Sequence, residues 1–143
     1  MIQFIDTGTG ADTADKRVIK TFIAGAAITA LDWVQLDTSK TDSDRVLYAI
    51  QAASGTATGN GLVVGVALDA AAAAGDKIRV VVRGYVEGAN VATAVNAAGL
   101  SVVVDATAGR AELAVLGDHN VAPIGVTLEA SSSNKADVYV LCG

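Results

Sequence analysis

Chemically reactive side chains are scarce in this chain. It contains one cysteine, Cys142, and one histidine, His119. A single cysteine excludes an intrachain disulfide and a cysteine-rich zinc site. His119 falls in a turn without a nucleophile beside it, and Cys142 falls at an inward-facing position of the last predicted strand. We therefore expect no catalytic residue, no cofactor and no metal site, and we expect that the protein is not an enzyme.

Aromatic and charged residues are few as well. Aromatic residues make up 4% and charged residues 17% of the 143 residues, whereas hydrophobic residues reach 52%. A hydrophobic share this high rules out a disordered chain, and the length fits one compact domain. The core is expected to be built from Val, Ala, Ile and Leu.

Long hydrophobic runs and clusters of positive charge are also absent from the sequence. No apolar run approaches the about 18–20 residues that cross a bilayer, and Met1–Asp6 lacks the features of a signal peptide. The net charge is −5, and the densest basic group, Lys77, Arg79 and Arg83, alternates as on the solvent face of a strand. Because nucleic-acid binding requires clustered cations, we expect neither a membrane nor a nucleic acid as partner.

Alternation of apolar and polar residues is the dominant pattern. Short segments rich in β-branched residues are separated by turn sequences such as Gly59-Asn60-Gly61. The expected strands are residues 17–23, 33–37, 45–50, 62–68, 77–86, 100–105, 111–115, 124–128 and 137–141. This spacing predicts an all-β fold, a small antiparallel β-barrel or sandwich.

Two segments of the chain repeat each other. Val64–Ala70 (VGVALDA) matches Ile124–Ala130 (IGVTLEA) at an offset of 60 residues. The same offset aligns Ile78, Val80 and Val82 with Val138, Val140 and Cys142. We interpret residues 24–88 and 89–143 as two similar halves of one closed barrel. Chance similarity in a chain rich in Val and Ala is the alternative.

The repeat also assigns roles to residues within it. Gly65 and Gly125 lie inside predicted strands, which indicates a bulge or a close backbone approach. Asp69 and Glu129 match, which indicates a shared role at a strand end. The five alanines of residues 70–74 are predicted to be a connector rather than a helix, because their counterpart, residues 130–134, consists of turn-forming residues.

Residues 1–14 differ from the rest of the chain because they show no alternation. We expect an extended N-terminal arm followed by a single β-barrel domain over residues 15–143, with a frayed end or an extra edge strand as alternatives. The core of one subunit is thin, so self-association is expected to bury further apolar area. The candidate contact residues are Ile2, Phe4 and Ile5 of the arm and the aromatic residues Trp33, Tyr48 and Tyr85. For Trp33, a place in the barrel interior is the alternative.

The repeated segments resemble a known family. Val64–Ala70, Ile124–Ala130 and the following Ala74–Gly84 are similar to the strand pairs of tailed-phage head decoration (capsid cement) proteins, and the resemblance extends over about residues 20–143. It implies a structural virion protein, made in the host cytoplasm, that binds the outer capsid surface and clamps neighbouring coat subunits. The implied partners are the major capsid protein and further copies of this chain, often in a homotrimer. By position, residues 1–14 would touch the shell.

One other function fits a small β-domain without reactive groups. A head-fibre or tail-associated module that recognises host surface glycans would need a surface cluster of aromatic and polar side chains. Binding of the isolated domain to glycans would distinguish such a module from a decoration protein.

Overall fold

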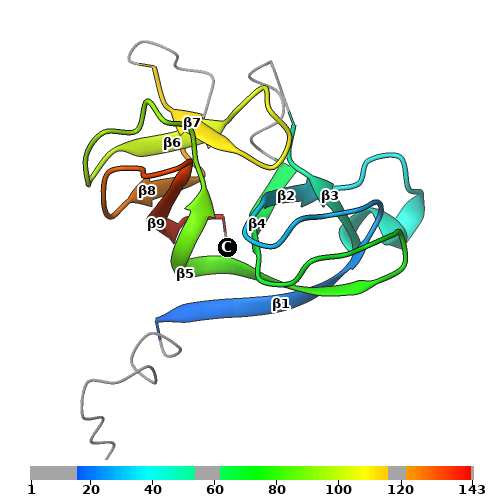
Figure 1. Ribbon diagram of the computed structural model, residues 1–143. Helices are drawn as coiled ribbons and strands as arrows, with labels where there is room; N and C mark the ends of the chain where they lie inside the picture. Colours follow the sequence, from blue (N-terminus) through cyan, green and yellow to red (C-terminus); the bar gives the residue numbers. More distant parts are fainter. Residues whose placement is uncertain (1–15, 54–61, 116–121, 143) are drawn as a thin grey trace, which may run out of the picture.

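The computed structural model describes residues 16–53, 62–115 and 122–142 (Figure 1). Its strands are β1 (Arg17–Ala24), β2 (Trp33–Leu36), β3 (Tyr48–Gln51), β4 (Val63–Ala67), β5 (Lys77–Asn90), β6 (Ser101–Val104), β7 (Ala111–Leu113), β8 (Gly125–Thr127) and β9 (Lys135–Val140), with one 3-10 helix, η1 (Asp42–Val46). The predicted all-β class is confirmed. The predicted arm, residues 1–14, lies outside the described residues.

Strand β5 shows why these sequences form strands. Its side chains alternate between exposed Lys77 and Arg79 and buried Ile78 and Val80. Successive side chains of a strand point to opposite faces, so alternation places the apolar residues on one face of the sheet. The strands then bury those faces together.

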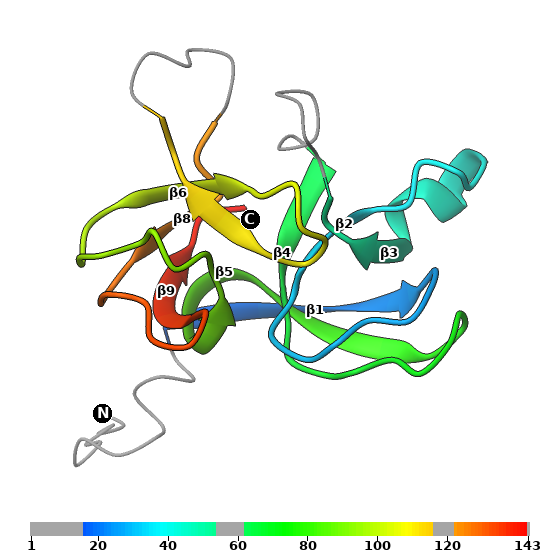
Figure 2. The same cartoon turned by 45° about the horizontal axis from the view of Figure 1, so that its top comes forward.

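The nine strands are arranged as two similar rings that share β5, as Figure 2 shows. In the first unit the strand order is β1-β3-β2-β4-β5, and β5 pairs with β1 to close the ring. In the second unit the order is β5-β9-β8-β6-β7, and an isolated bridge between Val91 and Ala111 brings β7 back to the end of β5. The β1–β3 pair and this bridge are parallel, whereas the other strand pairs of the described chain are antiparallel. The chain therefore closes into two rings that share β5, rather than into the one barrel predicted from two halves. The predicted bounds also differ from the rings, because β1 begins before residue 24 and β5 crosses the boundary between residues 88 and 89.

Equivalent hydrogen bonds recur in the two units. The amide of Arg79 donates to Asp69 Oδ2 over 2.9 Å, and the amide of Asp137 donates to Glu129 Oε1 over 3.0 Å. Asp69 and Glu129 thus have the same role, as the repeat predicts. Arg79 is equivalent to Asp137, an offset of 58 residues rather than the 60 expected, because the connection before β9 is two residues shorter than that before β5.

The predicted alignment of these strands is therefore wrong by two residues. Val80, not Ile78, is the equivalent of Val138, since Ala67 pairs with Val80 and Thr127 with Val138. A shift of two residues leaves every side chain on the same face of the sheet. The alternation of the sequence could therefore not reveal the error.

Both repeated glycines lie where another group approaches closely. Gly65 has φ +152°, and a Cβ there would lie 1.9 Å from the carbonyl oxygen of Val81. The register of β2 against β4 shifts opposite this glycine. A Cβ on Gly125 would lie 2.8 Å from Cη2 of Trp33. The predicted close backbone approach is confirmed at Gly65, whereas at Gly125 the nearest group is the side chain of Trp33 and the backbone oxygen of Tyr139 follows at 3.0 Å. The connector at residues 70–74 contains no helix.

Two hydrophobic clusters form the core. The smaller cluster fills the first unit and consists of Phe22, Ala24, Ile28, Val34, Ala49, Ala67, Ala71, Ile78, Val80 and Val82. The larger cluster fills the second unit and also takes in Trp33, Val66 and Val81 from the outer side of the first. Apolar packing therefore continues from the second unit to the boundary between the two units, which we call the junction.

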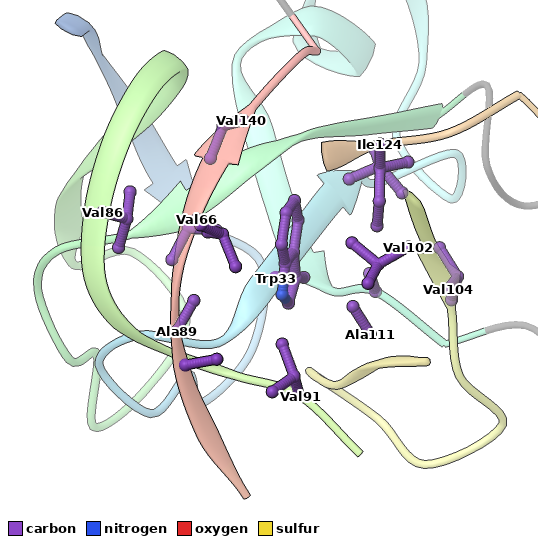
Figure 3. Packing of buried hydrophobic residues seen from close by; sticks show 14 of the residues in the cluster. Trp33, Val66, Val86, Ala89, Val91, Val102, Val104, Ala111, Ile124 and Val140 are labelled. Carbon is purple, nitrogen blue, oxygen red and sulfur yellow. The ribbon is translucent and has the colours of Figure 1, made fainter. Parts of the chain in front are cut away.

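Trp33 is at the centre of this junction. It is fully buried and lies among Val66, Val102 and Val91 (Figure 3). Its indole N–H donates to the carbonyl oxygen of Asn90 over 3.1 Å. The prediction of Trp33 as an intermolecular contact is therefore wrong: the side chain has no exposed surface, because the second unit covers it. It occupies an interior position, but in the core of the neighbouring unit.

A buried carboxylate stabilises the same junction. Asp32 is 4% exposed and accepts hydrogen bonds from the side-chain amides of Gln51 and Asn90. A buried charge is expensive unless it is hydrogen-bonded. These bonds satisfy the Asp32 carboxylate and connect β2 to β3 and β5.

Candidate interaction surfaces

The described residues contain no concentration of reactive groups. Among residues 16–53, 62–115 and 122–142, no three His, Cys, Asp or Glu residues gather in a way that could hold a metal ion. In the same ranges there is no helix long and apolar enough to cross a membrane. His119 lies outside the described residues. Burial raises the pKa of the Cys142 thiol to about 12, so the thiol is protonated at neutral pH.

Two buried carboxylates have structural roles in turns. Asp37 accepts hydrogen bonds from the amide and hydroxyl of Ser39, which lower the pKa of this carboxyl. Asp105 occupies the equivalent place after β6. Its carboxylate accepts a hydrogen bond from the amide of Thr107 and forms an ion pair with Arg110. Each carboxylate satisfies backbone groups that the strand no longer pairs, so both have a structural role in these turns.

Tyr48 and Tyr85, two of the predicted contact residues that the structure describes, lie in different units. Tyr48 lies on β3 in the first unit, where its half-buried ring is 4.6 Å from Nζ of Lys40. Tyr85 lies on β5 in the second unit, also half-buried. Ile2, Phe4 and Ile5 lie outside the described residues.

Tyr85 belongs to a surface on the second unit that we call the Tyr139 face. Tyr85 is directly opposite Tyr139, which is directly opposite Val126, so the three side chains share one side of the sheet. Tyr139 is 36% exposed, and the nearby Leu128 is 46% exposed. The face therefore presents a continuous apolar row across β5, β9 and β8.

Carboxylates surround this row. Tyr85 donates its hydroxyl to Asp137 Oδ2 over 2.9 Å, and the amide of Gly88 donates to Asp137 Oδ1. Burial raises the pKa of Tyr85 to about 12, with further contributions from this hydrogen bond and from the charges of Asp137, Glu87 and Glu129. The Tyr139 face is therefore apolar at its centre and has carboxylates around it, with exposed Lys135 on the same side of β9.

Six cations lie along the paired strands β1 and β5, at the lower edge of the molecule in Figure 1. We call them the basic ladder: Lys16, Arg17, Lys20, Lys77, Arg79 and Arg83. They do not share one face, because Lys20 is opposite the buried Val80, whereas Arg79 is opposite Thr21 on the other side of the pair. They are six of the ten Lys and Arg residues of the chain. Beside them, Val18 is 50% and Ile19 is 40% exposed.

Sequence reasoning missed the basic ladder. Its two parts, residues 16–20 and 77–83, are far apart in the chain and are brought together by the register that places Val18 opposite Arg83 and Thr21 opposite Arg79. Strand pairing therefore brings these cations near one another in space without gathering them on one face of the sheet. The exposed charges on neighbouring expected strands were the available signal, but the pairing of those strands was unknown.

Comparison with known proteins adds no family. No protein-family model matches the chain, and no curated protein has a significantly similar sequence.

Proposed function

We propose that the chain is a decoration protein, a structural virion protein that binds the outer surface of a phage capsid and clamps neighbouring coat subunits. The resemblance of its repeated segments to capsid cement proteins motivates the proposal. The partners are the major capsid protein and other copies of the chain, and residues 1–14 make the contact with the shell.

The way in which β1 is held supports this proposal. Seven residues of β1 pair with β5, from Arg17 opposite Gly84 to Ile23 opposite Lys77. Gly84 has φ +111°, and a Cβ there would lie 2.0 Å from the carbonyl oxygen of Lys16. The segment that follows residues 1–15 is thus fixed to the strand shared by both units. A load applied through the arm would be distributed over this whole set of backbone hydrogen bonds.

The stabilisation of a capsid follows from mass action. A protein that binds only the assembled shell stabilises it by RT ln(1 + [L]/Kd) at each site. Association of several copies raises the effective concentration of each arm at the shell. Weak individual contacts therefore suffice.

Deletion of residues 1–14 tests the proposal. We expect co-sedimentation with capsids of the parent phage to weaken by about tenfold or more, as the loss of one linked contact does. The unfolding midpoint of the truncated chain should be unchanged, because β1 begins at Arg17. Unchanged capsid affinity in a truncated protein that folds normally would contradict the role of the arm.

The Tyr139 face favours one second candidate, the glycan-binding module. Exposed Tyr139 beside Tyr85 and the hydrogen-bonding carboxylate of Asp137 offers the aromatic and polar groups that sugars bind. Screening of the purified chain and of Tyr139→Ala on a glycan array tests this candidate. Glycan binding that is lost in Tyr139→Ala would favour it over the decoration protein.

A further inference from the structure

We propose that the free backbone edge of β1 binds residues 1–14 of a second copy as an added strand, so that copies of the chain associate by exchanging arms. We call this edge, which extends over residues 17–21, the β1 edge. The inference goes beyond the proposed function, because it concerns the purified chain without a capsid. On a capsid, the shell and the β1 edge would compete for the arm.

The first argument is that the β1 edge is unpaired. β1 pairs with β5 over seven residues but with β3 only at Ile23 and Ala24, and the amide of Ile23 donates to the carbonyl oxygen of Leu47 on the β3 side. The N–H groups of successive residues alternate between the two edges of a strand, so those of Ile19 and Thr21 point to the same side as that of Ile23. Among the described residues, none pairs with them there.

An unpaired edge of this kind is a template for a further strand. Its free N–H and C=O groups pair readily with another chain, and many domains bind extended peptides by adding a strand to such an edge. The side chains along it are exposed, with Val18 at 50% and Ile19 at 40%. In Figure 1, β1 lies at the lower edge of the molecule. The place that an added strand would take is therefore accessible.

Charge identifies the arm as a strand that fits this edge. Residues 1–14 contain two Asp and no Lys or Arg, whereas Lys16, Arg17 and Lys20 lie along the edge. No ion pair joins these three cations to a carboxylate of the described chain. Arg17 and Lys20 project from opposite faces of β1, and an added strand has side chains on both faces, so both cations border it. Opposite charges favour this contact, whereas pairing of two β1 edges would bring like charges together.

The arm also has suitable side chains and sufficient length. Its large apolar residues, Ile2, Phe4 and Ile5, are of types that favour strands. Val18 and Ile19 of the edge offer exposed apolar surface to them. An extended chain spans about 3.3 Å per residue, so the arm can reach about 45 Å from its own β1.

The arm of a second copy fits the edge better than the arm of the same copy. The arm of the same copy directly precedes β1 and would have to reverse direction to lie beside it. The arm of a second copy can lie along the edge in either direction. Exchange of arms between two copies also fills both edges, as in a closed symmetric oligomer.

Proline at position 21 tests the β1 edge. Thr21→Pro removes the outward N–H and leaves the bonds to β5, and proline is tolerated where the N–H of an edge strand faces solvent. Thr21→Val keeps the N–H and is the matched control. In sedimentation velocity at about 50 mM NaCl, where screening is weak, the wild type and Thr21→Val are expected to associate. Thr21→Pro is expected to associate about tenfold more weakly, because it lacks one hydrogen bond of the contact.

Charge reversal in the arm tests the occupant without altering the described fold. Asp6→Lys/Asp12→Lys is expected to weaken association about tenfold or more. Asp44→Lys/Glu112→Lys makes the same change of net charge at exposed positions outside β1. This matched control should associate like the wild type.

Amide hydrogen exchange of the full-length wild type gives a result that depends on no variant. Exchange at Ile19 and Thr21 is expected to become about tenfold slower or more as the protein concentration rises and the edge is filled. Lys20 and Phe22, whose amides face β5, should be protected at every concentration.

Three results would overturn the inference. One is a wild type that stays monomeric at low salt, and another is a folded Thr21→Pro that associates like Thr21→Val. The third is protection of Ile19 and Thr21 that is independent of concentration, which would assign the edge to the arm of the same copy. None of these results concerns binding to capsids, which the deletion of residues 1–14 tests separately.

Discussion

The two units of this protein have the same strand order and share backbone hydrogen bonds at equivalent places, but equivalent residues can differ in charge. Arg79 in the first unit donates both its amide and its guanidinium to Asp69. At the equivalent place in the second unit stands Asp137, whose amide bonds to Glu129 while its carboxylate accepts from Tyr85. The backbone interaction is kept and the side-chain interaction is replaced. A β-fold thus constrains which backbone groups pair more strongly than which outward side chains accompany them.

The units also differ in how they fill the space between them. Trp33 in β2 and Ser101 in β6 are equivalent, because their carbonyl oxygens accept the amides of Ala52 and Ala114 over 2.9 and 3.0 Å. Trp33 is buried by the second unit, whereas Ser101 is half-exposed. One large side chain at an outward position therefore attaches the two rings to each other.

The largest effect expected from this difference is at Trp33. Trp33→Ala should lower the free energy of unfolding by about 3–5 kcal/mol, because it leaves a cavity in the larger cluster. Ser101→Ala should change it by no more than about 0.5 kcal/mol. Urea unfolding measures both, with Trp33→Phe as the variant to use if Trp33→Ala does not fold. Equal losses at the two positions would contradict the role of Trp33 at the junction.

Gly65 and Gly125 differ in whether the group next to them can move. Gly65→Ala places its Cβ against the backbone of Val81 and should cost about 3 kcal/mol or more. Gly125→Ala meets the ring of Trp33, which can shift, and should cost about 1–2 kcal/mol.

A double-mutant cycle with Trp33→Phe sharpens this comparison, since only neighbours couple. The smaller ring should reduce the cost of Gly125→Ala and leave the cost of Gly65→Ala unchanged. Equal coupling of Trp33 to both glycines in urea unfolding would refute the assignment.

Acid should act on the ion pair of the first unit. The hydrogen bonds from Arg79 lower the pKa of Asp69 below its usual 3.8. The unfolded chain therefore binds a proton first as pH falls, so the stability from this pair is present above about pH 4 and is lost as pH drops toward the lowered pKa. Asp69→Asn and Arg79→Met should both flatten the loss of stability between about pH 4 and pH 2. An unchanged slope in both variants would show that the pair does not contribute.

Alkali should act on the second unit. Because the pKa of Tyr85 is raised from 10.0 to about 12, the unfolded chain loses this proton first, and stability falls as pH rises above about 10. Absorbance of tyrosinate should show a component that titrates near pH 12 in the wild type. Tyr85→Phe should remove that component, and Asp137→Asn should move it to lower pH. A titration that is the same in all three proteins would contradict the surroundings assigned to Tyr85.

Much of this architecture could be predicted from the sequence, and particular residues show which features could not. The repeat of Gly65 and Gly125 and the turn residues at 130–134 identified the duplication and the connectors, because these signals are local. The connection before β9 is two residues shorter than the one before β5. The sequence pattern could not show this, because a shift of two residues preserves the alternation of apolar and polar residues. The position of Trp33 could not be predicted, because an outward residue of one strand is buried only if another unit lies over it. The basic ladder was missed for a similar reason: charges far apart in sequence come close together only when their strands pair.

The amino-acid order alone determined that the chain forms short strands, that its second half repeats the first, and that it has little reactive chemistry. These properties depend on residue type and on a period of two along the chain, both of which are local. The tertiary structure decided that β5 serves both rings, that Trp33 joins them, and that the cations of residues 16–20 and 77–83 lie on paired strands. Those outcomes depend on which faces bury one another, and burial is a property of distant segments in contact.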